Sequence, residues 1–364
     1  MEAAWQQSFR IDQTEVGFLS SSFFYGYALM QVPAGFLFDA IGIQKIIRYA
    51  VSLFIIGLIM LASTSSFYIA LCGRFMMGTG AGFAFVGMVF TAASWFGPRL
   101  FTSFVGLGEM LSMFLTAGGQ ASAPRFILQA GWRSLLYGFI GVGLLFLLLI
   151  FIFLKNPPHY QKLPYKIWPQ FKKYGRAVMT TPSVWLAGAY CSGMFGVITI
   201  FASLWGNPYL QNRYHLDYLS ASHLIALIPF GFGLGCPLLG AINERYIPHQ
   251  KLIITLAFAL LGCTLTMMYA GNDPTLLRIS LFFMGFLGGG NVIAFYIAER
   301  SVPPEMRGIA IGLCNALTIC AGIIFQPLIG MLWPHWGVHA MLVFPGLLFF
   351  SSIITLIYKN RPFA

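Results

Sequence analysis

The sequence predicts an all-α integral membrane protein with eleven transmembrane helices. Of its 364 residues, 58% are hydrophobic and only 9% are charged, whereas a soluble domain has about 25% charged residues. So few charges cannot cover a water-facing surface, which excludes soluble enzymes, nucleic-acid-binding domains and disordered scaffolds. The apolar stretches are continuous, whereas the strands of a membrane barrel are segments of about ten residues that alternate in polarity.

Eleven apolar runs are long enough to cross the hydrocarbon core, for which a helix needs about 20 residues. Short linkers with turn-forming residues separate most of them, for example Gly97-Pro98-Arg99 and Asn272-Asp273-Pro274. The predicted spans are 16–38, 46–64, 67–92, 101–123, 134–154, 184–206, 219–242, 251–270, 275–298, 308–329 and 337–358.

One long connection, 155–183, divides the spans into two blocks. It is basic, with Lys155, Lys162, Lys166, Lys172, Lys173 and Arg176. We therefore expect an N-terminal helical bundle over 1–154, a cytoplasmic linker over 155–183 and a C-terminal helical bundle over 184–364.

The two blocks repeat one another along the chain. The segment 101–111 (FTSFVGLGEML) aligns with 307–317 (RGIAIGLCNAL) at an offset of 206, and 35–39 aligns with 240–244 at an offset of 205. Two parallel halves of this kind are typical of transporters, in which the halves rock around a site between them.

The span 184–206 has no partner in this repeat, because its counterpart would fall before residue 1. The repeat therefore predicts a twelve-helix, two-bundle transporter fold that lacks its first helix in this chain. The alternative is a native eleven-span protein.

Lysine and arginine residues predict the orientation, since they gather on the cytoplasmic side of membrane proteins. Most of the 21 fall on one side if the 155–183 linker is cytoplasmic, which also makes the C-terminus cytoplasmic. The six cysteines lie inside apolar runs without a CxxC pair, so we expect no metal site.

Three motifs resemble those of the major facilitator superfamily. The segment Gly35-Phe-Leu-Phe-Asp39-Ala-Ile-Gly42-Ile-Gln-Lys45 resembles the loop signature of that family, although Ala40 stands where an arginine is usual. Arg74 followed by Gly78 resembles its Arg-xxx-Gly element, and Arg307 to Asn315 is also a familiar pattern there. The segments 23–35 and 78–87 are similar to phagosomal nutrient carriers of intracellular bacteria and to lysosomal dipeptide carriers.

The resemblance implies a secondary active or facilitative transporter that moves a small polar organic solute by alternating access. The solute would be an amino acid, a short peptide or another organic anion, with H⁺ as a candidate coupling ion. It also implies a monomer in the bacterial inner membrane, without enzymatic activity, a cofactor or a nucleic-acid partner. The alternatives are proton-coupled drug efflux and, because of the absent helix, a non-transporting remnant. Efflux members of the superfamily resemble one another in this span, with a Gly-Pro pair and a Gly-Gly pair. The span 101–123 has Gly118-Gly119 but no Gly-Pro pair, which disfavours efflux.

Six residues at matching ends of the two blocks are candidates for a conformational latch. Asp39 is placed to accept hydrogen bonds from a facing helix N-terminus or to pair with a cation, and Gly35 lets helices approach closely. The candidates are Gly35, Asp39, Gly42, Lys45, Gly240 and Glu244.

Arg74 and Glu109 are the strongly charged residues deepest inside predicted spans. A charge at such depth costs about 2.5 kcal/mol or more and needs a partner or a cavity. We expect Arg74 to bind a substrate carboxylate or, alternatively, to be a structural anchor on backbone carbonyls. Glu109 is a candidate proton site that is close enough in depth to pair with Arg74, or alternatively a polar packing residue.

Uncharged polar side chains inside the spans are the remaining site candidates. The principal ones are Tyr25, Tyr27, Gln31, Tyr190, Asn291 and Asn315, and the others are Gln120, Trp205, Tyr296 and Gln326. Taken singly, each is as well explained by helix packing. The sequence has no phosphate-binding loop, so ATP-driven transport has no support.

Overall fold

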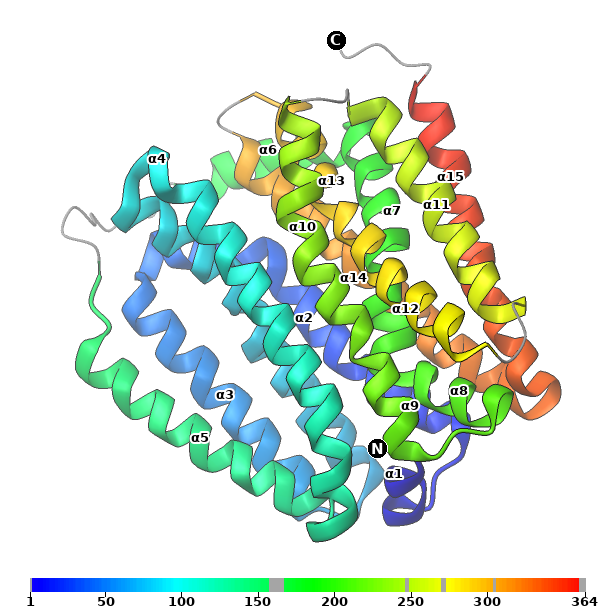
Figure 1. The fold of residues 1–364 in the computed structure, drawn as a ribbon. Coiled ribbons are helices and arrows are strands. Elements are labelled where there is room, and N and C mark those ends of the chain that lie inside the picture. Colours follow the sequence, from blue (N-terminus) through cyan, green and yellow to red (C-terminus); the bar gives the residue numbers. More distant parts are fainter. Residues whose placement is uncertain (1, 157–166, 246–248, 270–272, 304–305, 360–364) are drawn as a thin grey trace.

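The computed structural model describes residues 2–156, 167–245, 249–269, 273–303 and 306–359, and all the regular structure in these ranges is helical. Figure 1 shows α3, α4 and α5 on one side of the molecule and the helices from α7 to α15 on the other, with α2 running between them. The prediction of an all-helical protein is therefore confirmed.

The first half of the chain forms a short amphipathic start and then long helices. They are α1 (Glu2–Phe9), α2 (Gln13–Ile41), α3 (Ile43–Ser63), α4 (Phe67–Ala130) and α5 (Trp132–Phe153), followed by the linker helix α6 (Ile167–Met179).

The second half contains helices interrupted by turns of π and 3₁₀ geometry. They are α7 (Pro182–Gly196), the π-helix η1 (Val197–Trp205), α8 (Gly206–Tyr214), α9 (Tyr218–Ile225), α10 (Leu227–Arg245), α11 (His249–Tyr269), α12 (Pro274–Gly288), the 3₁₀ turn η2 (Gly289–Asn291), α13 (Val292–Arg300), α14 (Arg307–Trp336), the 3₁₀ turn η4 (Gly337–Leu342) and α15 (Val343–Lys359).

Eight segments among the described residues are long and apolar enough to cross a membrane. The predicted number of eleven is not confirmed. One reason is that the helical turn η4 joins α14 to α15, so that Gly308–Ser351 counts as one segment. The spans predicted at 67–92 and 101–123 likewise lie in one helical element, α4, without the expected break at Pro98.

The helix α4 nevertheless folds back on itself, as Figure 1 shows near its label. A side-chain atom added at Gly108 would collide with the sulfur of Met88. Two residues twenty positions apart in a straight helix would be about 30 Å apart. The contact therefore places the second arm of α4 beside the first, as two successive spans require.

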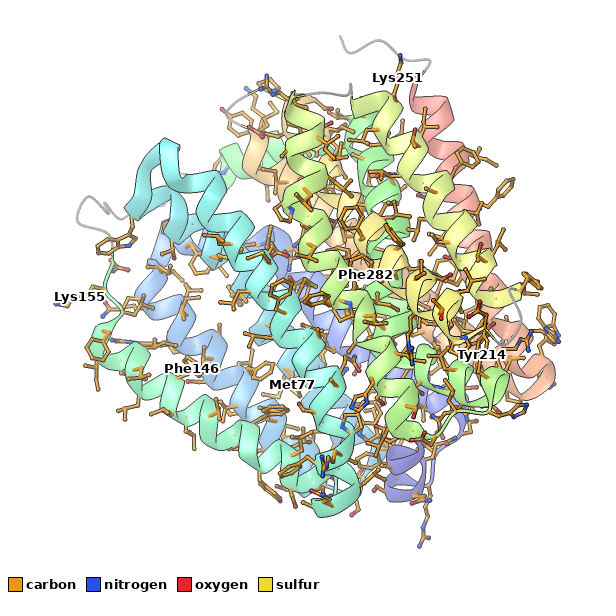
Figure 2. All side chains as sticks on the ribbon, viewed as in Figure 1. Met77, Phe146, Lys155, Tyr214, Lys251 and Phe282 are labelled. Carbon is orange, nitrogen blue, oxygen red and sulfur yellow. The ribbon has the colours of Figure 1, made fainter. Side chains whose placement is uncertain are left out.

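Aspartates begin three helices at the same end of the molecule. Asp12 and Glu15 form a reciprocal capping box at α2, with Glu15 N–H donating to Asp12 Oδ1 over 2.8 Å. Asp217 and Asp273 accept hydrogen bonds from the first backbone N–H groups of α9 and α12. The bonds from Ser220 above all hold the pKa of the Asp217 carboxyl below its usual value. Lys251 lies at the opposite end, beside the end of α15 (Figure 2).

The helix pair α2–α4 packs through glycines without intervening side chains. A Cβ at Gly26 would collide with the carbonyl oxygen of Phe75, and one at Gly78 with the carbonyl oxygen of Phe23. Small residues of this kind let helix backbones approach closely in membranes, where the hydrophobic effect does not drive helices together.

The same two contacts recur in the second half, between α10 and α12. A Cβ at Gly231 would collide with the carbonyl oxygen of Phe282, and one at Gly285 with that of Ile228. Figure 2 labels Phe282 at this junction. Each of these residues stands 205 or 207 positions after its counterpart in the first pair, so the repeat seen in the sequence is also a repeat of packing.

Two further helix pairs connect the first half of the chain to the second. The helices α2 and α14 pack antiparallel, with Gly17 against the backbone of Gln326 and Gly322 against the ring of Phe24. The second arm of α4 packs on α10, where the rings of Phe114 and Phe230 stack 5.1 Å apart. These two pairs exchange under the repeat, as expected for halves related by an axis along the membrane normal.

We predict that Gly78→Ala and Gly285→Ala each lower the free energy of unfolding by about 1–3 kcal/mol, because the added methyl group forces two helix backbones apart. Thermal unfolding in detergent would measure the change. Gly118→Ala and Gly262→Ala are the matched controls, since a Cβ at either position meets nothing within 4 Å. Equal effects at all four positions would contradict the packing role.

Candidate functional site

Three of the predicted polar residues meet midway along the α2–α14 contact. The Asn315 Nδ2 donates to Gln31 Oε1 over 2.5 Å, and the Tyr27 hydroxyl lies close to both side chains. Gln31 Nε2 also donates to the carbonyl oxygen of Gly82 on α4 over 3.3 Å. Gln31 and Asn315 are 1% and 8% exposed, so their amides are matched to each other rather than to bulk water. We call Tyr27, Gln31 and Asn315 the central polar cluster.

Glu109, on the second arm of α4, lies next to this cluster. Its carboxyl lies within electrostatic range of the Tyr27 hydroxyl and of the thiol of Cys236 on α10. The side chain is half-buried. A carboxyl that borders hydrogen-bonding groups from both halves is suited to take up and release a proton as those groups rearrange.

Asn291 and Tyr190 form a second group on the far side of Cys236. The Cys236 thiol lies 3.9 Å from Asn291 Oδ1, and the Tyr190 hydroxyl donates to the carbonyl oxygen of Gly290 over 3.3 Å. Both contacts are made at η2, where three consecutive glycines tighten the helix into a 3₁₀ turn. Such a turn inside a span frequently marks a functional hinge.

Arg74 lies apart from Glu109 and is held by α2. Its Nε donates to the carbonyl oxygen of Leu19 over 3.3 Å and its Nη2 to that of Ser20 over 3.1 Å. The guanidinium also lies 5.0 Å from the ring centre of Phe23 and 5.6 Å from that of Trp5. These contacts correspond to the structural anchor among the two predicted roles.

The latch candidates are only partly described. Gly42 has a φ of +91° and packs against Asn156, whose side chain accepts a hydrogen bond from Gln44 N–H over 3.1 Å. Lys45 is exposed, and Gly240 makes an ordinary contact with Val292. The surroundings of Gly35 and of the Asp39 and Glu244 side chains lie outside the described part of the structure.

Other predicted polar residues gather around η1, nearer the end of the molecule at which α2 begins, which is the outer end in the predicted orientation. Gln326 Nε2 donates to the carbonyl oxygen of Thr199 over 2.6 Å, and Trp205 Nε1 donates to the carbonyl oxygen of Gln326 over 3.0 Å. Gln120, on the second arm of α4, donates to the carbonyl oxygen of Ala202 over 3.0 Å. We call Gln120, Thr199, Ala202, Trp205 and Gln326 the outer cluster.

The remaining two candidates belong to neither cluster. The Tyr25 hydroxyl donates to the carbonyl oxygen of Ile323 over 3.4 Å and adds to the α2–α14 contact. Tyr296, on α13, lies under the guanidinium of Arg300 at 5.3 Å.

Sequence reasoning did not include Cys236, Asn156 or the hinge glycines among the site residues. The run Gly288-Gly289-Gly290 before Asn291 is visible in the sequence and is the signal that identifies η2. Nothing in the sequence distinguishes Cys236 from the other apolar positions of α10. Among the described residues, no group of three His, Cys, Asp or Glu side chains is arranged to hold a metal ion.

The chain is similar to membrane transporters over most of its length. It is 24% identical to the probable galactarate/D-glucarate transporter GarP of Escherichia coli, over 93% of this chain and 84% of that protein. It is 26% identical to the mouse voltage-gated purine nucleotide uniporter SLC17A9, over 90% of this chain and 77% of that protein.

Solved structures share the fold at low sequence identity. The nucleoside transporter NupG superposes with a TM-score of 0.74 at 14% identity and covers 98% of this chain and 93% of its own. A bacterial homologue of the human lysosomal transporter Spinster, in an inward-facing and occupied conformation, has a TM-score of 0.72 at 13% identity, over 99% of this chain and 92% of its own. The model of the Major Facilitator Superfamily matches residues 1–315. This chain, with its repeated halves and their polar interface, therefore belongs to the Major Facilitator Superfamily, and it is a multi-pass membrane transporter and not an enzyme.

Proposed function

We propose that the chain is a secondary carrier that moves a small polar organic solute between its two halves by alternating access. The halves are residues 1–154 and 184–364, joined by the cytoplasmic linker 155–183. The observation that carries the proposal is the hydrogen bond between Gln31 and Asn315, which joins the two halves in the interior of the protein. Buried amide groups whose hydrogen bond crosses from one half to the other are free to exchange partners with a polar solute when the halves move.

The chemistry of the central polar cluster indicates the class of solute. Tyr27, Gln31 and Asn315 offer uncharged donors and acceptors, and Glu109 offers a titratable one. Hydroxyl, amide and carboxylate groups of a polar organic molecule match such a set better than a bare ion does. The names of GarP and SLC17A9 refer to sugar diacids and purine nucleotides, which are organic anions. An organic anion, amino acid or short peptide is the solute that we propose.

The packing repeat supports the two-bundle arrangement that alternating access requires. It also reveals one difference between the halves in the exposure of corresponding side chains. Leu115 on α4 is 69% exposed and Leu144 on α5 is 52% exposed, whereas their repeat counterparts Ala321 and Leu348 are each 1% exposed in the second half, where α7 packs on α14 and α15. We propose that the chain lies in the bacterial inner membrane with a cytoplasmic C-terminus. We also propose that Asp39 is a residue of the conformational latch.

Uptake into vesicles tests the proposed function. The reconstituted chain should take up at least one of galactarate, ATP, a nucleoside, an amino acid and a dipeptide in a saturable way, above empty vesicles. Gln31→Ala and Asn315→Ala should lower kcat/KM for that solute about tenfold or more, because each removes a solute-binding amide and leaves its partner unmatched. Ser112→Ala, at an exposed position of α4, is the control. Wild-type activity in both amide variants would remove the central polar cluster from the pathway.

For Arg74 we propose the structural role. Arg74→Lys should lower the free energy of unfolding by about 1.5–3 kcal/mol, the usual worth of hydrogen bonds to a charged group, because lysine cannot donate to two carbonyls in a fixed fork. The solute concentration that gives half-maximal uptake should not change. A raised half-maximal concentration with unaltered thermal unfolding would instead support the substrate-carboxylate anchor.

Glu109 is the proposed proton site. Glu109→Gln keeps the shape of the side chain but cannot lose a proton, so uptake should become independent of an imposed pH gradient while binding persists. Uptake measured with and without the gradient, in wild type and variant, checks this. If the two proteins respond equally to the gradient, Glu109 is a packing residue.

A further inference from the structure

The π-helix η1 is an irregular stretch inside the span Pro182–Tyr214. It runs for nine residues, and the N–H of Gly206 that follows it donates to the carbonyl oxygen of Phe201, five positions back. π-Helices are rare and mostly single-turn features, and they frequently occur at functional sites. In this protein, side chains of other helices donate hydrogen bonds to backbone carbonyls of η1.

Two glutamines supply these bonds from two different helices. Gln326, on α14, donates to the carbonyl oxygen of Thr199 and to Ser203 Oγ over 2.6 and 3.0 Å. Gln120 donates to the carbonyl oxygen of Ala202 from the second arm of α4. Gln326 belongs to the same half as η1, whereas Gln120 belongs to the other half. The bond from Gln120 therefore ties the halves together at the outer end.

The tie is reinforced by a close backbone contact. Gly17 on α2 faces the carbonyl of Gln326 so closely that an added Cβ would lie 2.8 Å from its oxygen. A Cβ at Gly330, one turn further along α14, would lie 2.6 Å from the carbonyl oxygen of Gln13. The outer ends of the two halves are thus closed along α2–α14 and along α4–η1.

Gln326 also has an unmatched group in this closed arrangement. Its side chain is fully buried, and its Oε1 has no hydrogen-bond partner. A buried acceptor without a donor carries an unfavourable desolvation term. In the closed arrangement, the bond from Gln120 to Ala202 holds the outer ends together. The Oε1 of Gln326, in contrast, gains a hydrogen-bond donor when water enters.

We propose that Gln120, Gln326 and η1 form an outer gate latch, in which the Gln120 bond to Ala202 holds the outward side closed. This inference rests on the proposed alternating access and adds the residues that control its outer side. Loss of the Gln120 bond shifts the protein toward an outward-open arrangement. The free energy of one interhelical hydrogen bond in a membrane corresponds to roughly a threefold change in the ratio of outward-open to outward-closed molecules.

Spin-label distance measurements test the latch without needing a solute. The labels are placed at Arg125→Cys and Asn212→Cys, two exposed positions at the outer ends of the two halves, in a background with exposed Cys72 replaced by serine. In lipid nanodiscs, Gln120→Leu should raise the ratio of the long-distance to the short-distance population roughly threefold. Gln7→Leu, which changes an exposed glutamine at the same end, should leave the distribution as in the parent.

Gln326→Leu is a second variant, expected to shift the ratio in the same direction because the carbonyl of Thr199 loses its donor. Gln120 is only half-buried, so its variant folds even if the Gln326 variant does not, and it decides the question alone. An unchanged distance distribution in folded Gln120→Leu overturns the latch. If the parent takes up none of the tested solutes while Gln120→Leu still lengthens the distances, the latch stands and the proposed carrier function fails.

Discussion

The close approach of helix backbones at glycines is the constraint on which the rest of this structure depends. In a bilayer, apolar side chains gain little by leaving lipid for protein, so helices associate through tight packing and a few hydrogen bonds. Gly26 and Gly78 bring α2 against α4, and Gly231 and Gly285 bring α10 against α12 in the same way. Each pair packs without intervening side chains at these positions of its half. The other helices, and the polar side chains that they present, take their positions from these two pairs.

The arrangement of the two halves explains why polar side chains lie at the interface between them. Gln31 and Asn315 lie on helices of different halves that face one another, and both side chains are buried there. The hydrogen bond between them therefore belongs to the assembled arrangement, whereas the bond of Gln31 to Gly82 lies within the first half. The same holds for Gln120 and the carbonyl oxygen of Ala202. The interface between the halves thus combines a small number of polar bonds at different depths with close backbone contacts such as that of Gly17 and Gln326. A motion that changes the interface leaves the halves intact.

Three arginines of the described residues secure helix ends and helix pairs. Arg133 donates to the carbonyl oxygens of Ala62 and Thr64 and so satisfies the end of α3, and Arg48 donates to the carbonyl oxygen of Phe151 near the end of α5. Arg74 does the same for carbonyls inside α2. At a helix end a guanidinium supplies donors to carbonyls that have no partner within the helix, where water is not available to them in hydrocarbon. Glu109 differs from these arginines because its neighbours belong to both halves.

The sequence by itself determined the all-helical membrane class and the repeat of the two halves, because apolar run length and repeat spacing can be read directly from the order of the residues. Its motifs also indicated the family, and its polar residues inside apolar runs included most of those at the interface. The tertiary structure decided what those residues touch. Arg74 meets the carbonyl of Leu19, which lies 55 positions earlier, and no local pattern could have separated this anchor from a substrate-binding role. The segment VITIFASLW of η1 reads as an ordinary apolar helix, whereas its π geometry and its bonds with Gln120 and Gln326 of other helices are seen only in the folded chain. The break expected at Pro98 was likewise absent from α4, where the chain reverses without leaving helical geometry.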